Sequence, residues 1–385
     1  MNIAIITGHF PPSKGGGIAE WALGIARELP KLGHTTSVYV THRKNRDLSI
    51  HKDEKFDCHP MYGRNWHEFH RFYAGYYMWK ILKENPDTVF IVTTWGMAKS
   101  FNFLKKRYPK SKMIVVAHGL EITRLKPSRE LSTMTKVVSS SDLVLSVSKF
   151  TRDEIINRLD SINTNHVKFL PNGVDTNRFF PIEADESFLE KYNIPIGSDL
   201  ILTLARIIKR KAHDDVIRAM PDILSAFPQA HYAIAGPHRK KDPYLYFLKQ
   251  LVKDLSLEKH VTFIDFIPDE DLKKIYSVSK VYVMASRTLH ETGDSEGFGI
   301  TFLEANACGC PVIGSYEGGI PDAVENEING LLVPSDSPND ISKAIKKLFS
   351  NEDYRKNIVK KGMERVSNKF TWEKLTIQML DMLNS

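Results

Sequence analysis

Residues 294–304 have the sequence Asp294-Ser295-Glu296-Gly297-Phe298-Gly299-Ile300-Thr301-Phe302-Leu303-Glu304. The two glycines predict a turn, and the apolar residues after Gly299 predict the first turns of a buried helix. Glu296 and Glu304 stand near the two ends of this run. At about 1.5 Å per helical residue, roughly 12 Å would separate their carboxylates. The segment therefore predicts a helix start flanked by two acidic side chains.

A helix start of this kind is a site for an anion. The backbone N–H groups of Gly297, Phe298, Gly299 and Ile300 would have no carbonyl partner within the helix, and the helix dipole favours negative charge there. A diphosphate would fit this position. The expected spacing of the two carboxylates is close to the length of a nucleotide sugar from its hexose to its ribose, so the pattern indicates a sugar-nucleotide site.

Length and composition indicate a soluble protein of two domains. The chain has 385 residues, of which 42% are hydrophobic and 26% are charged, and this length is typical of two domains of about 150–200 residues. The N-terminal segment lacks a basic leader, and no segment approaches the roughly 18 apolar residues that cross a bilayer. The three cysteines, Cys58, Cys308 and Cys310, predict no disulfide framework. We therefore expect a cytoplasmic protein.

The formal net charge of +7 favours anionic partners. Nucleotides, anionic lipids and nucleic acids all fit this description, but the sequence has no nucleic-acid signature such as paired zinc ligands. We expect no nucleic-acid partner. Because a phosphate site balances only part of the excess charge, we also expect a weak peripheral contact with an anionic membrane, at its inner face.

Short apolar runs alternate with amphipathic segments along the whole chain, which is typical of parallel sheets with crossover helices. The predicted strands of the first half are residues 3–7, 36–41, 89–94, 113–118, 143–148 and 167–171. Those of the second half are residues 200–205, 230–235, 261–266, 280–285, 311–314 and 331–333. The predicted fold class is α/β, with two Rossmann-like domains and a ligand cleft between them.

The turn-rich segment after Pro171 marks the domain boundary. We expect residues 1–178 to form the N-terminal domain and residues 179–370 the C-terminal domain. Residues 371–385 predict an amphipathic helix. Its apolar positions are Trp372, Leu375, Leu380 and Leu383.

Arg206 and Lys211 follow the first predicted strand of the second half. Two cations beyond the carboxyl end of a strand can neutralise a diphosphate and the charge that builds on it when a sugar departs. The alternative is a solvated basic turn, because Lys209 and Arg210 lie in the same segment.

The acidic residues also have two interpretations. A helix start alone would explain Glu296, because negative charge is favourable there. Glu304 falls among apolar residues, where an unpaired charge is unfavourable. Hydrogen bonds from ribose hydroxyls would offset that cost. The run Asp269-Glu270-Asp271 resembles a paired-aspartate metal motif, but it follows Pro268 and predicts the acidic first turn of a helix. We therefore expect no metal, and no cofactor besides a nucleoside diphosphate sugar as co-substrate.

Features of the first half carry a weaker signal. Glycines in residues 11–17 would let backbone amides approach an anion, although the spacing matches neither nucleotide-binding fingerprint and a plain turn is the alternative. His118 ends a predicted strand and could contact a sugar hydroxyl or phosphate, but a lone histidine is more often structural. Residues 64–80 are rich in aromatic and basic residues, which suits an acceptor site, a membrane interface or a core-facing helix.

Together these motifs resemble the retaining GT-B glycosyltransferases of family 4, a large group of mannosyl- and glucosyltransferases. The resemblance extends over nearly the whole chain and rests on Gly15 to Gly17, His118-Gly119, Pro171-Asn172-Gly173-Val174-Asp175, Arg206 with Lys211, Glu296 with Glu304, and Phe370-Thr371-Trp372-Glu373. It implies metal-independent transfer of a hexose with retention of configuration.

The resemblance also implies a role for each motif. Arg206 and Lys211 would hold the donor diphosphate, and Glu304 the ribose. Glu296 would bind hydroxyls of the transferred sugar, and His118 would lie against that sugar. The final helix would pack back onto the N-terminal, acceptor-side domain, and the C-terminal domain would bind the nucleotide sugar. The implied catalytic residues are Arg206, Lys211, Glu296 and His118, and the implied donor-binding residues are Gly16, Gly17, Arg206, Lys211, Gly297, Phe298, Gly299, Ile300 and Glu304.

Within the family, the likeness is nearest to the bacterial phosphatidylinositol mannosyltransferase group, on Arg287-Thr288 and residues 293–300. This favours GDP-mannose as donor, with a UDP- or ADP-sugar as the alternative, and a lipid-linked or glycan hydroxyl as acceptor. Ala212 stands where the family usually has glycine, so we expect the backbone there to differ slightly.

Two rival functions stay open: a sugar-nucleotide epimerase with the same two-domain plan, and a non-catalytic protein that binds a nucleotide sugar or a lipid headgroup. A NAD dehydrogenase is disfavoured because its fingerprint is missing.

Overall fold

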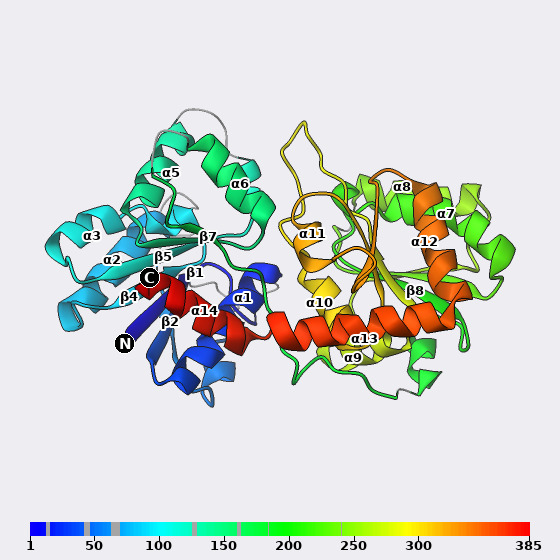
Figure 1. The fold of residues 1–385 in the computed structure, drawn as a ribbon, viewed down its shortest axis with the longest axis horizontal. Helices are drawn as coiled ribbons and strands as arrows, with labels where there is room; N and C mark the ends of the chain where they lie inside the picture. Colours follow the sequence, from blue (N-terminus) through cyan, green and yellow to red (C-terminus); the bar gives the residue numbers. More distant parts are fainter. Residues whose placement is uncertain are drawn as a thin grey trace. The chain divides into compact units, whose positions relative to one another are not determined.

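The computed structural model describes residues 1–12, 16–41, 47–62, 70–124, 129–159, 163–183, 185–239 and 241–385. Within these residues the chain forms two compact units. Unit 1 consists of residues 1–173 and 372–385, and unit 2 of residues 174–371. Each unit contains one parallel sheet with helices around it (Figure 1), which confirms the predicted α/β class. The predicted cleft between the domains stays a prediction.

The sheet of unit 1 has seven parallel strands in the described part of the chain. In spatial order they are β3 (Asp57–Met61), β2 (Thr35–Thr41), β1 (Asn2–Thr7), β4 (Val89–Val92), β5 (Lys112–Ala117), β6 (Leu143–Ser146) and β7 (Val167–Phe169). The central strands are almost wholly buried, as expected for parallel strands covered on both faces. All of these strands except β3 overlap a predicted strand.

The helices of unit 1 are α1 (Gly17–Glu28), α2 (His70–Glu84), α3 (Phe101–Arg107), α4 (Leu120–Thr123), α5 (Arg129–Ser140), α6 (Lys149–Arg158) and α14 (Trp372–Asn384), with short 3-10 helices η1 (Leu29–Leu32), η2 (Ser49–His51) and η4 (Trp95–Ala98). They bury apolar side chains against the sheet, where residues such as Met78, Phe101 and Val115 form a common core.

Among the described residues, the sheet of unit 2 has six parallel strands: β10 (Val261–Ile264), β9 (Ala230–Ala235), β8 (Asp199–Leu204), β11 (Val281–Met284), β12 (Val312–Ser315) and β13 (Gly330–Val333). Its helices are α7 (His213–Ala226), α8 (Pro243–Asp254), α9 (Asp269–Val278), α10 (Ile300–Ala307), α11 (Ile320–Ala323), α12 (Pro338–Ser350) and α13 (Glu352–Lys369), with 3-10 helices η5 (Glu186–Tyr192) and η6 (Lys209–Lys211). All six strands overlap predicted ones. The strand order reverses between β8 and β11, which is where folds of this kind bind ligands at the carboxyl edge.

The last helix returns to unit 1. α14, dark red in Figure 1, packs against α1 and buries its predicted apolar positions. Its first residue, Trp372, covers two glycines so closely that a Cβ atom at Gly24 would lie 2.3 Å from the indole, and one at Gly173 would lie 2.7 Å from it. Both positions therefore require glycine, and Trp372 anchors the helix.

The division between the units falls at 173/174 and 371/372, close to the expected boundaries at 178/179 and 370/371. Hydrogen bonding explains the position of the first one. The N–H of Val174 donates to the carbonyl of Phe370 over 2.8 Å, and Val174 also forms a β-bridge with Thr371. The segment after Gly173 is thus tied to the chain of unit 2.

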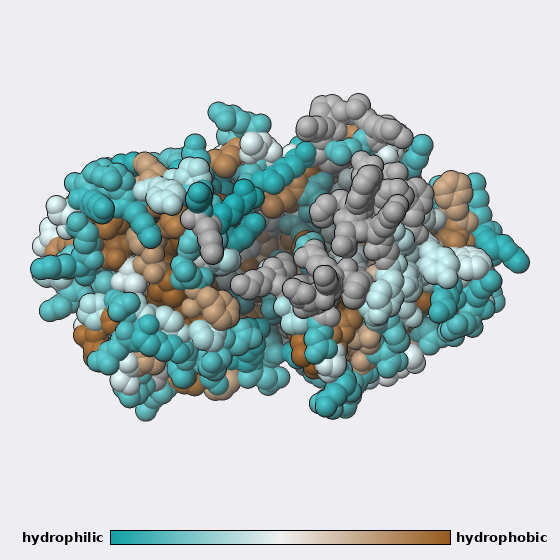
Figure 2. Space-filling model, turned by 180° about the vertical axis from the view of Figure 1, so that it is seen from behind, coloured by the Kyte–Doolittle hydropathy of each residue, from teal (hydrophilic) through white to brown (hydrophobic). Residues whose placement is uncertain are grey.

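On the face drawn in Figure 2, hydrophilic side chains predominate among the coloured atoms, with hydrophobic ones scattered between them. Among the described residues, no helix combines the length and the apolar character that a membrane span needs.

Candidate active site

The turn that follows β8 places four basic residues in two environments. Arg206 and Lys209 are exposed, whereas Arg210 and Lys211 are buried. The 3-10 helix η6 produces this difference, because its last two residues turn inward. The alternative of a solvated basic turn is therefore wrong for Arg210 and Lys211.

Ala212 links η6 to α7 with φ 53° and ψ 37°. This is the left-handed region, which glycine enters readily and alanine enters at a cost of about 1–2 kcal/mol. The turn thus has the backbone conformation that glycine would adopt, although the residue is alanine. This conformation starts α7 directly after Lys211 and fixes the direction of the turn.

Lys211 forms an ion pair with a buried carboxylate. Its Nζ contacts Oε2 of Glu296 and lies 3.1 Å from the thioether sulfur of Met284 on β11. Burial lowers the pKa of Lys211 to about 8, although the charge of Glu296 acts in the opposite direction. Lys211 is therefore a cation at neutral pH that loses its charge readily in alkaline solution.

A second cation shares the same carboxylate oxygen. Nη1 of Arg210 contacts Oε2 of Glu296, and its Nε lies 3.0 Å from Oδ1 of Asp294. Burial alone would raise the pKa of Glu296, but the charges of Arg210 and Lys211 outweigh it and lower this pKa to about 2. Glu296 is thus ionised throughout the physiological range.

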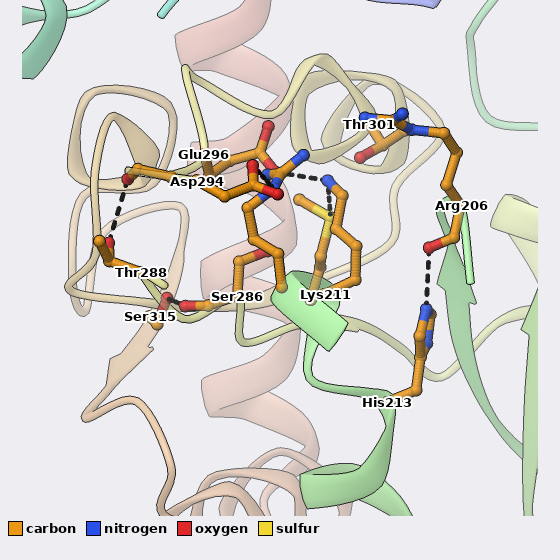
Figure 3. A network of polar contacts seen from close by, with 12 residues as sticks. Arg206, Lys211, His213, Ser286, Thr288, Asp294, Glu296, Thr301 and Ser315 are labelled. Atoms are coloured by element: carbon orange, nitrogen blue, oxygen red, sulfur yellow. Dashed lines mark hydrogen bonds and ion pairs between the residues drawn. The ribbon is translucent and has the colours of Figure 1, made fainter. Parts of the chain in front are cut away.

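Arg206 lies beside this cluster. Its charge helps to lower the pKa of Lys211, so the two cations are within electrostatic reach, and Figure 3 shows both side chains extending in the same direction from the turn. The backbone carbonyl of Arg206 lies 3.2 Å from Nε2 of His213. Burial lowers the pKa of His213 to about 4. A neutral imidazole that donates from Nε2 therefore holds the backbone of Arg206.

Glycines position the acidic loop before α10. A Cβ atom on Gly318 would lie 2.4 Å from the carbonyl oxygen of Glu296, and the N–H of Gly319 donates to that oxygen over 2.8 Å. Gly299 has φ 94°, and a Cβ atom there would lie 2.7 Å from the ring of Phe302. Close packing of backbone on backbone therefore fixes Glu296, and packing of the Phe302 ring on Gly299 fixes the start of α10.

The start of α10 lies at the same edge of the unit 2 sheet as the cations after β8. The N–H groups of Ile300 and Thr301 are at the first helical positions, where the helix supplies no carbonyl partner. Arg206 and Lys211 follow β8, and α10 follows the loop after β11, which is the strand paired with β8. Cations and helix dipole thus act at one edge of the sheet, as a phosphate site requires.

Glu304 is buried on α10 and has an internal partner. The hydroxyl of Tyr276 donates to its Oε2 over 2.9 Å, and burial together with the charge of Glu304 raises the pKa of Tyr276. The predicted contact with ribose stays a prediction. The helical estimate of the distance between Glu296 and Glu304 does not apply, because α10 begins only at Ile300.

The predicted residues of unit 1 lie at the carboxyl edge of its own sheet. Gly16 has φ 62° and caps α1, which begins at Gly17; residues 13–15 of the glycine-containing loop lie outside the described residues. His118 follows β5 and packs edge-on against Trp21 of α1, with 6.0 Å between the ring centroids. Burial, and then the charge of His9, lower the pKa of His118 to about 3. Its Nε2 has no hydrogen-bond partner among the described residues.

Comparison with known families assigns both halves of the chain. Residues 15–178 match the model described as Glycosyltransferase Family 4, and residues 185–365 match Glycosyl transferases group 1. This chain belongs to the family 4 glycosyltransferases.

The glycosyltransferase has mannosyltransferases among its relatives. It is 27% identical to the GDP-mannose-dependent α-(1-6)-phosphatidylinositol monomannoside mannosyltransferase of Mycobacterium tuberculosis, over 99% of this chain and 97% of the relative. The protein of the same name from Mycolicibacterium smegmatis is 30% identical over 64% of this chain and 63% of its own. The recognised likeness to the phosphatidylinositol mannosyltransferase group is confirmed.

Solved structures share the fold of the glycosyltransferase. A glycosyltransferase from Rickettsia africae superposes with a TM-score of 0.82 at 20% identity, covering 100% of this chain and 97% of the other. HepE of Anabaena, in complex with UDP and glucose, has a TM-score of 0.80 at 17% identity, with coverage of 100% and 99%. The GT-B fold class is therefore confirmed.

The structure groups the predicted site residues of the glycosyltransferase by unit. Gly16, Gly17 and His118 belong to unit 1. The others belong to unit 2, namely Arg206, Lys211, Glu296, Gly297, Phe298, Gly299, Ile300 and Glu304. Phe298 is buried and packs on Phe370, with 6.2 Å between the ring centroids, so its side chain supports the turn.

Sequence reasoning missed a pair of arginines that hold the acidic loop. The sequence pattern places Arg210 among solvated cations and gives Arg287 no role. Nη2 of Arg287 lies 3.0 Å from Oδ1 of Asp214 and 2.6 Å from Oδ2 of Asp215. Both acids are in the first turn of α7, far from Arg287 in the sequence, so no local pattern connects them.

The acidic run after Pro268 belongs to a helix. Asp269 to Asp271 form the first turn of α9, as predicted. Within the described ranges, no group of three or more histidine, cysteine or acidic side chains is arranged to hold a metal ion.

Proposed function

We propose that the protein transfers a hexose from a nucleoside diphosphate sugar to a hydroxyl acceptor, with retention of anomeric configuration. The observation that carries this proposal is the gathering of Lys211, Arg206 and the start of α10 at one edge of the unit 2 sheet. This edge has the charge and the backbone donors that a diphosphate needs. The names of the mannosyltransferase relatives favour GDP-mannose as the donor.

The chemistry of these residues supports electrostatic catalysis. The bond between the anomeric carbon and the diphosphate breaks, and the acceptor oxygen bonds to that carbon on the same face. The departing phosphate oxygen takes the proton of the acceptor hydroxyl. Lys211 and Arg206 stabilise the negative charge that builds on the leaving group. Electrostatic stabilisation of this kind is usually the largest single contribution to catalysis.

Glu296 suits a binding role better than a nucleophilic one. Its Oε2 is neutralised by both Arg210 and Lys211, and a carboxylate engaged by two cations is a weak nucleophile. A buried, ionised carboxylate next to the diphosphate site can accept hydrogen bonds from sugar hydroxyls. This supports attack by the acceptor on the same face over a covalent intermediate on Glu296.

Nucleotide binding tests the donor assignment. Because GDP-mannose is the proposed donor, we expect GDP and GDP-mannose to raise the unfolding temperature more than the UDP or ADP series. A ligand present at 100 times its Kd stabilises the folded state by about 2.7 kcal/mol. Thermal unfolding with each nucleotide measures this. EDTA is expected to leave the shift unchanged, since we also propose that no metal is needed. If none of the nucleotides raised the unfolding temperature, the donor site would be contradicted. Loss of the shift in EDTA would contradict metal independence.

Product analysis separates transfer from the rival activities. With GDP-mannose and a lipid or glycan acceptor, we expect a glycosylated product that retains the α configuration. An epimerase would convert the donor without an acceptor, and a binding protein would release no sugar with any acceptor.

We further propose that unit 1 contacts an anionic membrane through α2 and α3. Ala74, Met78 and Leu82 of α2 are buried, whereas Tyr76 and Trp79 are exposed. Nζ of Lys83 lies 3.9 Å above the ring of Trp79. On the neighbouring helix α3, Phe103 is 77% exposed next to Lys106 and Arg107. Exposed aromatic rings beside cations are typical of surfaces that bind lipid headgroups; residues 64–69 of the predicted aromatic segment lie outside the described residues.

Vesicle binding tests this contact. Lys83→Gln is expected to weaken binding to vesicles that contain phosphatidylglycerol about fivefold, since each basic residue near such a surface contributes about 1 kcal/mol. Lys253→Gln, on the exposed face of α8 in unit 2, is the charge-matched control. Co-sedimentation at low and high salt provides the measurement. Equal losses in the two variants would assign the attraction to net charge instead of to this surface.

A further inference from the structure

Glu296 has two cationic partners, and they differ in how firmly they are held. Both contact the same oxygen, Oε2. The Arg210 side chain is 4% exposed and also pairs with Asp294 through Nε. Its backbone carbonyl accepts a hydrogen bond of 2.9 Å from the N–H of Arg287. The planar guanidinium is therefore held through two of its nitrogens, Nε and Nη1.

Lys211 is held less firmly. Its ammonium has one strong acceptor, Glu296, and one weak acceptor, the sulfur of Met284 at 3.1 Å. A lysine ammonium is a point charge with three donors on a flexible stem. The ammonium can change partner when the stem rotates. A comparable movement of Arg210 would break its ion pairs with two carboxylates at once.

Charge balance indicates why this difference matters. Arg210 and Lys211 together neutralise Asp294 and Glu296, so the cluster has no net charge before a ligand arrives. An incoming diphosphate needs a cation from this cluster in addition to Arg206. If Lys211 were the sole partner of Glu296, its departure would leave a buried carboxylate unpaired, which is strongly unfavourable.

We propose that Arg210 is a positioning residue, the permanent counter-ion of Glu296 and Asp294, which allows Lys211 to exchange Glu296 for the donor diphosphate. This inference rests on the proposed function. Arg210 itself does not touch the donor. It holds the acidic loop in place and keeps Glu296 paired while Lys211 moves.

A double-mutant cycle tests this role. Arg210→Met is expected to lower kcat/KM for the donor about 10- to 100-fold, a range typical of coupled groups in one buried network. Because Arg210 acts through Glu296, the same change in a Glu296→Gln background is expected to add a loss of less than about threefold. Lys209→Met, an exposed position in the same turn, is the matched control and is expected to leave kcat/KM unchanged. Additive losses in the cycle would overturn the positioning role.

The pH profile gives a second readout that a merely structural role would not move. Arg210 lowers the pKa of both Glu296 and Lys211. In Arg210→Met, Glu296 is therefore expected to protonate at a higher pH, and Lys211 to lose its proton at a higher pH. Both the acidic and the basic limb of kcat/KM should move upward. Limbs that coincide with those of the wild type would overturn the proposal.

Unfolding measurements distinguish this proposal from the proposed function. The four proteins of the cycle are the wild type, Arg210→Met, Glu296→Gln and the double variant. They are unfolded in urea without any substrate, and the coupling between Arg210 and Glu296 is calculated from their free energies of unfolding. Coupling in stability, combined with a wild type that neither binds nucleotides nor transfers sugar, would overturn the proposed function and with it the exchange. Coupling in both stability and kcat/KM supports the proposal. The absence of coupling in stability would overturn the pairing itself.

Discussion

Lys211→Met is expected to lower kcat about 10²- to 10³-fold while the protein stays folded. A single fixed donor or cation that stabilises developing charge contributes about 2.7–4 kcal/mol to catalysis. Methionine retains most of the buried aliphatic volume of Lys211 and removes only its charge. Steady-state kinetics with saturating donor measure the effect, and a near-normal kcat would contradict the assignment of Lys211 to the diphosphate site.

The pH dependence of the wild type provides an internal check on this result. Since kcat/KM reports the free enzyme, it should fall as pH rises through about 8, where Lys211 loses its proton. In the donor complex the diphosphate raises the pKa of Lys211, so the limb in kcat should lie at higher pH. Lys211→Met should lack this limb. A basic limb near pH 8 that persists in the variant would belong to another group.

Trp372→Ala is expected to destabilise unit 1 by about 3–5 kcal/mol, the usual loss for a large aromatic side chain removed from a core. Trp372 fills the space above Gly24 of α1 and Gly173, and neither residue has a side chain that could close the gap. Because the protein has two units, the loss should appear as an earlier first transition in urea instead of as a uniform shift.

Ile377→Ala is the matched control for this prediction. Ile377 lies on the same helix, α14, and is 41% exposed, so its truncation should change stability by much less than that of Trp372. Equal effects of the two substitutions would show that helix propensity, and not the anchor, determines how α14 docks.

The strands of both sheets could be predicted because parallel strands covered on two faces are continuous apolar runs. β3 (Asp57–Met61) is the exception. It is an edge strand whose exposed Asp57 and His59 alternate with partly buried neighbours, and it contains Pro60. A segment of this kind has neither the apolar run nor the composition typical of a strand.

The site could be predicted where its signal is local. Lys211 and Glu296 each stand in a recognisable segment, and the structure pairs them. Arg210 could not be separated from the exposed Lys209 by sequence, because its burial depends on a loop 86 residues further along the chain. The same applies to Arg287, whose acidic partners in α7 are 73 and 72 positions away.

The path of the chain at Gly173 and Trp372 determines how the protein can be divided for expression. Unit 2 is one uninterrupted stretch, residues 174–371, whereas unit 1 needs a second piece, residues 372–385, to cover α1. A fragment that ends at residue 173 would present the bare surface of Gly24 and its neighbours to water. Grafting the final helix onto that fragment through a short flexible linker follows as the way to produce a soluble N-terminal half.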